Sequence, residues 1–277
     1  MVIRELIQKV NKRLSDAGID NSLFETHQII RHVFNFSPVD LILNHEKDAS
    51  AMESEILQLV QRRENHEPLQ YILGTQEFMS LEFMVEKNVL IPRSDTETLV
   101  EYVMENTSGS LSLLDIGTGT GCIPLSVAHY NKNAYVRGID INPTAISLAE
   151  KNAEKLGLSR RAIFEKLDIL NQMPKGKYDI VTSNPPYIES DIIPTLQLEV
   201  RDFEPHTALD GGNDGLIFYR RIIHISPAFL KPKGILIFEI GYNQAESVSQ
   251  LMENDFENIQ VIKDLSGNDR VVVGTLK

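Results

Sequence analysis

The chain has 277 residues, which is enough for one large domain or for a catalytic domain with a small companion. It carries 27 lysine and arginine residues against 39 aspartate and glutamate residues, and this net charge of −12 argues against generic nucleic-acid binding. A single cysteine, Cys122, excludes a disulfide framework, and no apolar run is long enough to span a membrane. We therefore expect a cytoplasmic protein without a membrane segment.

The first quarter of the chain has a helical pattern. Apolar residues between Ile3 and Leu14 recur with the spacing of one helix face, and strand-forming segments are nearly absent. Short runs of β-forming residues with polar breaks follow, and they predict a hairpin. We therefore expect a small helical domain over 1–73, a β-hairpin linker over 74–92 and a larger domain over 93–277.

The larger domain is expected to be of the α/β class. Ser94 and Glu97 have the spacing of a capping box, which places a helix start at Ser94. Farther on, short apolar runs alternate with amphipathic stretches, as in a mostly parallel sheet with helices on both faces. The last two strands have no helix between them and should pair antiparallel. The seven predicted strands are Leu111–Gly117, Tyr135–Asp140, Ala162–Asp168, Tyr178–Asn184, Gly234–Ile240, Ile259–Lys263 and Arg270–Leu276.

A glycine-rich turn follows the first predicted strand of this sheet. Gly117, Gly119 and Gly121 let the backbone turn tightly and let a ligand come close. The next strand ends at Asp140, whose carboxylate would lie where it can accept hydrogen bonds from two ribose hydroxyls. Together they predict a cofactor that contains a nucleoside. A nicotinamide dinucleotide is an alternative, although Cys122 stands where that fingerprint normally has glycine or alanine.

The segment Asn184-Pro185-Pro186-Tyr187 follows a strand beside the predicted cofactor cleft. Its two prolines fix φ and remove two backbone donors, so the loop is stiff and presents carbonyl oxygens. The Asn184 side chain adds another acceptor, and Tyr187 adds a flat aromatic wall. These groups fit a planar NH2 group whose two protons need two acceptors.

The glycine turn and the Asn184 segment together resemble the class I methyltransferases. These enzymes use S-adenosylmethionine. The resemblance is to those members of the class that methylate a nitrogen conjugated to a π system, which is an adenine or cytosine amino group or the side-chain amide of glutamine. Such a nitrogen is a poor nucleophile because its lone pair is delocalised. The resemblance implies that the Asn184 side chain and the Pro185 carbonyl orient that lone pair toward the methyl group and stabilise the charge that develops on nitrogen.

Three further motifs narrow the resemblance. Ile91–Glu97, Phe203–Leu209 and Asn268–Val271 occur in order around the segment that begins at Asn184. This set is similar to the bacterial release factor glutamine methyltransferase family, which methylates the glutamine of the Gly-Gly-Gln loop in peptide-chain release factors. The resemblance covers nearly the whole chain. It implies a Rossmann-like methyltransferase domain over 93–277 and a substrate-recognition role for the helical domain.

The resemblance also implies site residues. The S-adenosylmethionine site, which would hold S-adenosylhomocysteine after the reaction, is expected to comprise Gly117, Thr118, Gly119, Thr120, Gly121, Asp140, Asp168 and Asn184. The glutamine amide is expected to bind at Asn184, Pro185, Pro186 and Tyr187, with catalytic roles for Asn184, Pro185 and Tyr187. Arg93, Asp95 and Thr96 lie in a motif that is expected to line the cofactor pocket. No metal is expected, because the seven histidines are scattered.

Two positions depart from the family pattern. The family commonly has proline where Ser94 stands, and some members carry an aromatic residue where Ile169 follows Asp168. The mixed charges between Glu199 and Glu204 are expected to form a solvated face or a lid.

Two other functions are kept as alternatives. A DNA adenine-N6 methyltransferase shares both sites, but the net charge of −12 and the lack of a basic segment count against it. A catalytically silent adaptor that kept the cofactor fold is the other. The expected partner is a release factor bound by a monomer, with no membrane or nucleic-acid partner.

Overall fold

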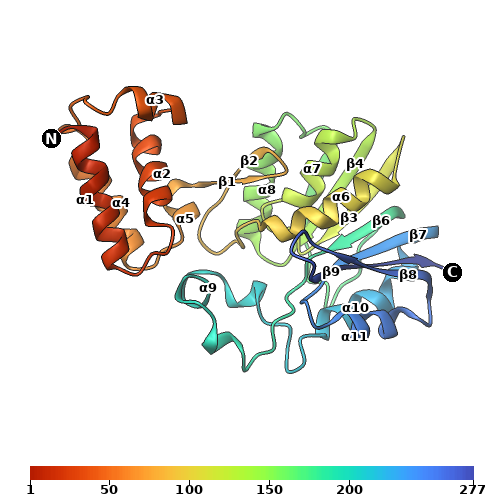
Figure 1. Cartoon of the computed structure of the whole chain (residues 1–277). Coiled ribbons are helices and arrows are strands. Elements are labelled where there is room, and N and C mark those ends of the chain that lie inside the picture. Colours follow the sequence, from red (N-terminus) through yellow and green to blue (C-terminus); the bar gives the residue numbers. More distant parts are fainter. The chain divides into compact units, whose positions relative to one another are not determined.

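The computed structural model describes residues 1–277, and its chain forms two compact units (Figure 1). The smaller unit comprises Met1–Gly74 together with Leu198–Phe203, and the larger comprises Thr75–Gln197 and Glu204–Lys277. None of the helices is both long enough and apolar enough to cross a membrane.

The smaller unit is helical, as predicted. The apolar residues of its first helix that recur on one face, from Ile3 to Leu14, are all buried and belong to one hydrophobic core. That core removes the apolar stripe of each long helix from water, which stabilises helices that would be marginal alone. The helices of this unit are α1 (Ile3–Asp16), α2 (Ser22–Phe34), α3 (Pro38–Leu43), α4 (Glu53–Glu64), α5 (Leu69–Leu73) and α9 (Leu198–Phe203).

The predicted hairpin consists of β1 (Thr75–Phe78) and β2 (Leu81–Met84), which pair antiparallel. It is shorter than its sequence pattern indicated, because no strand continues beyond Met84. Phe78 and Phe83 are almost fully buried and meet edge to face, with their ring centroids 6.1 Å apart. The hairpin therefore packs as part of the larger unit's core.

The capping box predicted at Ser94 is wrong. Ser94–Thr96 forms a short 3-10 helix, η1, and helix α6 (Glu97–Asn106) follows it without a side-chain cap. Glu97 instead accepts a hydrogen bond from the backbone N–H of Met79 in the hairpin turn, at 2.5 Å. The Glu97 carboxylate thus joins the helix start to the hairpin, a tertiary contact that local spacing could not reveal.

The larger unit contains the predicted α/β sheet, and its seven strands have the order β5-β4-β3-β6-β7-β9-β8. All neighbours pair parallel from β5 to β7, and β9 pairs antiparallel with both β7 and β8. Every predicted strand is present with its ends shifted by a few residues. The observed strands are β3 (Leu111–Ile116), β4 (Ala134–Asp140), β5 (Ala162–Lys166), β6 (Tyr178–Ser183), β7 (Leu230–Glu239), β8 (Phe256–Lys263) and β9 (Asp269–Leu276).

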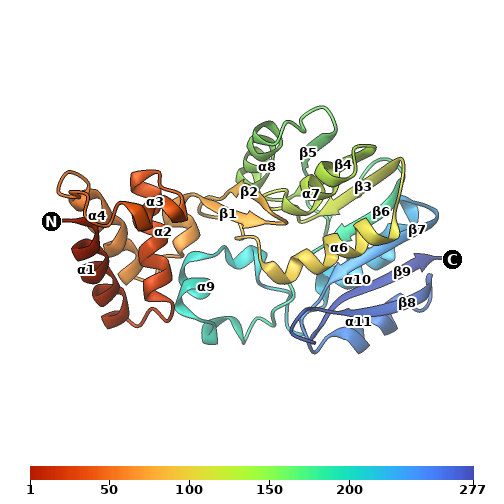
Figure 2. The ribbon, with the colours of Figure 1, turned by 45° about the horizontal axis from the view of Figure 1, so that its top comes forward.

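Helices cover both faces of this sheet (Figure 2). Helix α6 and two others, α7 (Cys122–Tyr130) and α8 (Pro143–Lys155), pack on one face, and α10 (Ile217–Ile225) and α11 (Ala245–Met252) pack on the other. Successive strand residues alternate between the two cores, since Leu113 belongs to one and Leu114 to the other. Asn142 caps α8 as predicted, because its side chain accepts from the backbone N–H of Thr144 at 2.9 Å.

A long insertion separates β6 from α10. It contains the short 3-10 helices η2 (Ile193–Thr195) and η3 (His206–Ala208), with α9 between them. After α10, the 3-10 helix η4 (Ser226–Ala228) leads into β7. The chain thus leaves the larger unit after Gln197, contributes α9 to the helical unit, and returns at Glu204.

Candidate active site

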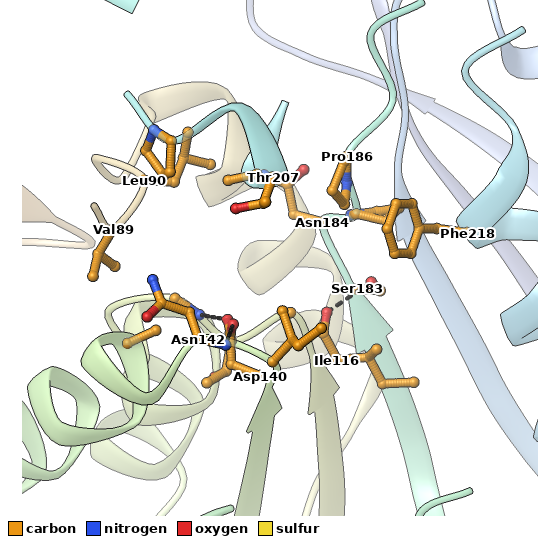
Figure 3. Close-up of a pocket in the computed structure, with 18 of the residues that line it drawn as sticks. Val89, Leu90, Ile116, Asp140, Asn142, Ser183, Asn184, Pro186, Thr207 and Phe218 are labelled. Atoms are coloured by element: carbon orange, nitrogen blue, oxygen red, sulfur yellow. Dashed lines mark hydrogen bonds between the residues drawn. The ribbon is translucent and has the colours of Figure 1, made fainter. Parts of the chain in front are cut away.

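The larger unit contains a cavity of about 440 Å³ at the carboxyl ends of β3, β4 and β6. Figure 3 shows Leu90 on one side of it, Asn184 and Phe218 on the opposite side, and Asp140 at the strand ends. A cavity in this position lies at the topological switch point of the sheet, where open α/β folds bind their ligands. Its volume is also typical of a small-molecule site.

The glycine turn forms part of the cavity wall. Gly117, Thr118, Gly119 and Thr120 all line it, as the sequence predicted. The backbone N–H groups of Gly117 and Thr118 both donate to the carbonyl of Ile139, at 2.9 and 3.0 Å, which fastens the turn to β4. Gly119 has φ of 55°, a left-handed conformation that favours glycine.

Asp140 holds the turn as well as lining the cavity. Its Oδ2 accepts from the Gly119 N–H and its Oδ1 from the Asn142 N–H, both at 2.9 Å. Burial raises the pKa of Asp140, while these backbone donors lower it. A carboxylate has about four acceptor sites, so the two backbone bonds leave capacity for two ribose hydroxyls.

Gly121 does not line the cavity. It begins α7 with φ of 79°, and a Cβ there would lie 3.0 Å from Leu125 and 3.1 Å from Ala149. The sequence pattern placed Gly121 at the cofactor. In the structure, glycine is required there because a side chain would collide with Leu125 and Ala149 of the adjoining helices.

Asp168 and Ile169 line the cavity beyond β5. Asp168 accepts from the Leu170 N–H at 3.0 Å and from Asn171 Nδ2 at 2.7 Å, so it shapes the turn in which it lies. Ile169 is nearly buried and presents an aliphatic surface where some relatives were expected to present an aromatic ring. This surface, with Ile116 and Ile139, gives the cavity apolar walls suited to a purine ring.

Asn184, Pro185 and Pro186 line the same cavity, and Figure 3 shows Asn184 and Pro186 on the side opposite Leu90. Tyr187 does not line the cavity; its side chain packs against the core between the sheet and α10. Burial raises the pKa of the Tyr187 phenol, so it remains neutral. Its backbone carbonyl accepts from Gln244 Nε2 at 3.0 Å, which anchors the end of the segment.

Two further segments complete the wall: the motif with Arg93 and Thr96, which lines the cavity as expected although its Asp95 does not, and a segment of the insertion that was not predicted to do so. Residues 88–93 and Thr96 line the cavity from one direction, and Pro205 to Ala208 line it from another. Arg93 forms an ion pair with Glu204, which is 4% exposed. The expectation that Glu204 belongs to a solvated charge cluster is therefore wrong. The family motifs that contain Arg93 and Glu204 were the only sequence signal for this contact.

The fold and the cavity define a Rossmann-like methyltransferase. A methyltransferase domain model matches residues 107–272, and a PrmC N-terminal domain model matches residues 5–74. A methyltransferase from Pyrococcus furiosus shares the fold, with a TM-score of 0.52 and 16% identity over 70% of this chain and 88% of that one.

Full-length relatives narrow the class to one family. The release factor glutamine methyltransferase of Geobacter sulfurreducens is 40% identical over 99% of this chain and 96% of its own length. That of Moorella thermoacetica is 38% identical over 98% of this chain and 97% of its own length. The chain belongs to the release factor glutamine methyltransferase family.

Proposed function

We propose that this protein transfers the methyl group of S-adenosylmethionine to the side-chain amide nitrogen of a glutamine in a peptide-chain release factor. The acceptor is the glutamine of the Gly-Gly-Gln loop. The observation that carries the proposal is the position of Asn184 and Pro185 on the wall of the cavity that the glycine turn and Asp140 also line. Family membership supplies the identity of the protein substrate.

The residues present fit the methyl donor. Asp140 would hold the ribose hydroxyls, the aliphatic side chains of Ile139 and Ile169 would enclose the adenine, and the glycine turn would allow the methionyl part to approach the backbone. Asp168 would contribute a further polar group at the adenosine end. When bound, the donor supplies an electrophilic methyl group on a positively charged sulfur.

Asn184 and Pro185 would act on the acceptor amide. Its two N–H groups would donate to Asn184 Oδ1 and to the Pro185 carbonyl, and the two stiff prolines would keep these acceptors in place. The acceptors orient the nitrogen lone pair, and their hydrogen bonds strengthen as positive charge develops on that nitrogen. The buried phenol of Tyr187 stays neutral and packs against the core, so its part would be to support the loop that carries Asn184 and Pro185.

The division of labour follows the two units. We propose that residues 1–73 recognise the release factor, that 74–92 link them to the methyltransferase domain, and that the enzyme acts as a cytoplasmic monomer without nucleic acid. Glutamine is too common in proteins for its amide alone to select one site, so contacts remote from the amide must supply the specificity.

Transfer of labelled methyl groups tests this function. Purified release factor and duplex DNA are offered separately with labelled S-adenosylmethionine, and mass spectrometry locates the methyl group. We expect label on the glutamine of Gly-Gly-Gln and none on DNA. Label on DNA adenine would establish the alternative substrate, and cofactor binding without turnover on either acceptor would identify a silent adaptor.

A further inference from the structure

The side chain of Asn184 is itself held by a second residue. Its Nδ2 donates to the hydroxyl of Thr96 at 3.2 Å, although the two residues lie 88 positions apart in the chain. Thr96 ends η1, is 3% exposed, and lines the same cavity as Asn184. Because Nδ2 is turned to Thr96, Oδ1 is the atom left to accept from a substrate amide.

A buried carboxylate faces this pair. Glu239 ends β7 and is 2% exposed. Burial raises the pKa of Glu239 to about 7. The hydroxyl of Thr96, the charge of Arg270 and the side chain of Asn184 oppose this rise, because each stabilises the ionised carboxylate. One carboxylate oxygen, Oε2, is buried without a hydrogen-bond partner. An unpaired buried acceptor is costly, so this carboxylate requires a donor from the groups that face it.

An ionised Glu239 would set the direction of the hydrogen bonds around Asn184. A carboxylate only accepts, so the Thr96 hydroxyl must point its proton toward Glu239. The Thr96 oxygen then accepts, which selects the Asn184 orientation with Nδ2 toward Thr96. If the side chain at position 239 instead donated a hydrogen bond to the Thr96 oxygen, the Thr96 O–H would be free to donate to Asn184 Oδ1. That bond would stabilise the reversed orientation of the Asn184 amide. The reversed amide would present Nδ2 to the substrate nitrogen and repel its protons.

We propose that Glu239, acting through Thr96, is a positioning residue that fixes the Asn184 amide with Oδ1 toward the methyl-accepting nitrogen. The proposal rests on the proposed function, because it assigns the support of the group that would bind the acceptor amide. Hydrogen bonds linked in a chain also polarise one another, so the carboxylate strengthens Oδ1 as an acceptor.

The other titratable groups that face Glu239 do not change their protonation state near neutral pH. Burial raises the pKa of Cys122 to about 12 and raises the pKa of Tyr187 and of Tyr219, so all three stay neutral. Burial lowers the pKa of Arg270, but Asp264 and other neighbouring acids raise it, so Arg270 stays charged. Asp95 pairs with Arg270 at 3.1 Å.

Glu239→Gln in the full-length protein is the first test, with the exposed Glu253→Gln as its matched control. We expect single-turnover methyl transfer to release factor to fall about 10- to 100-fold in E239Q, as for loss of one preorganised hydrogen bond. The Kd for S-adenosylmethionine and the KM for release factor should stay within about threefold of wild type. E253Q should keep the wild-type rate.

The pH profile gives a readout that a merely structural role would not change. The wild-type rate should rise with pH as Glu239 ionises, with a midpoint near pH 7, and E239Q should lack this rise. Burial also raises the pKa of Asp115, on β3, to about 7. Because Asp115 is present in both wild type and E239Q, its titration affects both pH profiles equally, and the readout is the difference between them. An unchanged profile in E239Q would overturn the proposal.

Variants at Thr96 test the relay independently, including the case in which E239Q fails to fold. Thr96→Val should slow transfer about as much as E239Q, and Thr96→Ser should recover most of that loss because it restores the hydroxyl. The double variant should be no slower than the slower single one, since both break one chain. Equal rates for T96V and T96S, additive losses, or a folded E239Q within about threefold of wild type would each contradict the proposal.

These outcomes are separable from failure of the proposed function. The wild-type arm alone decides whether release factor is the acceptor. The ratio of variant to wild-type rates decides the role of Glu239. If DNA proves to be the acceptor, this ratio can be measured on duplex DNA, because an adenine amino group would also donate a hydrogen bond to Asn184 Oδ1.

Discussion

Asp140 Oδ2 accepts a hydrogen bond from the backbone N–H of Gly119 at 2.9 Å, which fastens the acid at the end of β4 to the middle of the glycine turn after β3. Its other oxygen accepts from Asn142 at the start of α8. The carboxylate therefore organises two turns of the cavity wall before any ligand binds. Loss of Asp140 should remove both this support and the acceptors proposed for ribose.

Asp140→Ala should weaken binding of S-adenosylmethionine about 10-fold to several-hundred-fold. Charge-assisted hydrogen bonds contribute about 1.5 to 3 kcal/mol each, partly replaced by water, and about 1.4 kcal/mol corresponds to a tenfold change in affinity. Titration calorimetry measures the change, with the exposed Asp255→Ala as control. Asp140→Asn should lose less, because its amide oxygen can still accept one bond. Unchanged affinity in D140A would reject the ribose assignment.

Asn184→Ala should slow methyl transfer by about 100-fold or more, because it removes an acceptor whose value rises with the charge on the substrate nitrogen. Asn184 is only half-buried, so the melting temperature should change little. Single-turnover transfer with saturating substrates measures the effect, and Asn106→Ala, exposed at the end of α6, is the matched control. A folded N184A within a few-fold of the wild-type rate would show that the proposed role of Asn184 is wrong.

Much of the fold was predictable because its elements follow local periodicity. The helical stripe from Ile3 to Leu14, the strands of the sheet and the Asn142 cap depend on residues close together in the chain. The start of α6 was not predictable in this way, since Glu97 bonds the hairpin turn rather than a cap at Ser94.

The same distinction applies to the site. Gly119 and Asp140 were found because a turn and the end of the next strand meet at one sheet edge in this topology. The contacts of Asn184 with Thr96 and of Arg93 with Glu204 join segments about 90 to 110 positions apart, for which no local pattern exists. Motif resemblance marked most of these residues without showing what they touch.

Asp115→Asn should change how stability depends on pH. Asp115 is fully buried, its Oδ1 accepts from Thr182 at 2.8 Å, its Oδ2 has no partner, and burial raises its pKa to about 7. Between about pH 4 and 7 the native state keeps a proton that the unfolded state has released, so wild-type stability falls as pH rises.

The substituted amide cannot ionise, so the melting temperature of D115N minus that of wild type should be more positive at pH 8 than at pH 5. Each kcal/mol should shift the melting temperature by about 2 to 4 °C. Glu239 titrates in the same range in both proteins and cancels in this difference. A difference that is constant with pH would show that Asp115 is ionised in the native state throughout.

Arg63 connects the insertion to the helical unit. Its guanidinium, 4% exposed, donates to Glu25 of α2 at 2.5 and 3.1 Å and to Glu199 of α9 at 2.6 Å. Glu199 bonds Arg63 while its own side chain stays 36% exposed, so it remains partly solvated as expected. Removal of the helical domain would leave α9 without this partner, so a truncation must be compared with a variant that breaks only the α9 contact.

A protein that starts at Thr75 should bind S-adenosylmethionine with near-normal affinity, because every residue that lines the cavity lies in the larger unit. It should lose most of its transfer to intact release factor, with kcat/KM falling about 100-fold or more, because remote contacts that position the substrate would be gone. Glu199→Gln keeps the helical domain and loses the Arg63 ion pair, and should fall much less. Calorimetry measures cofactor binding, circular dichroism measures folding, and labelled transfer measures activity. Wild-type kcat/KM in a folded truncation would refute recognition by the helical domain, and an equal loss in E199Q would assign recognition to α9.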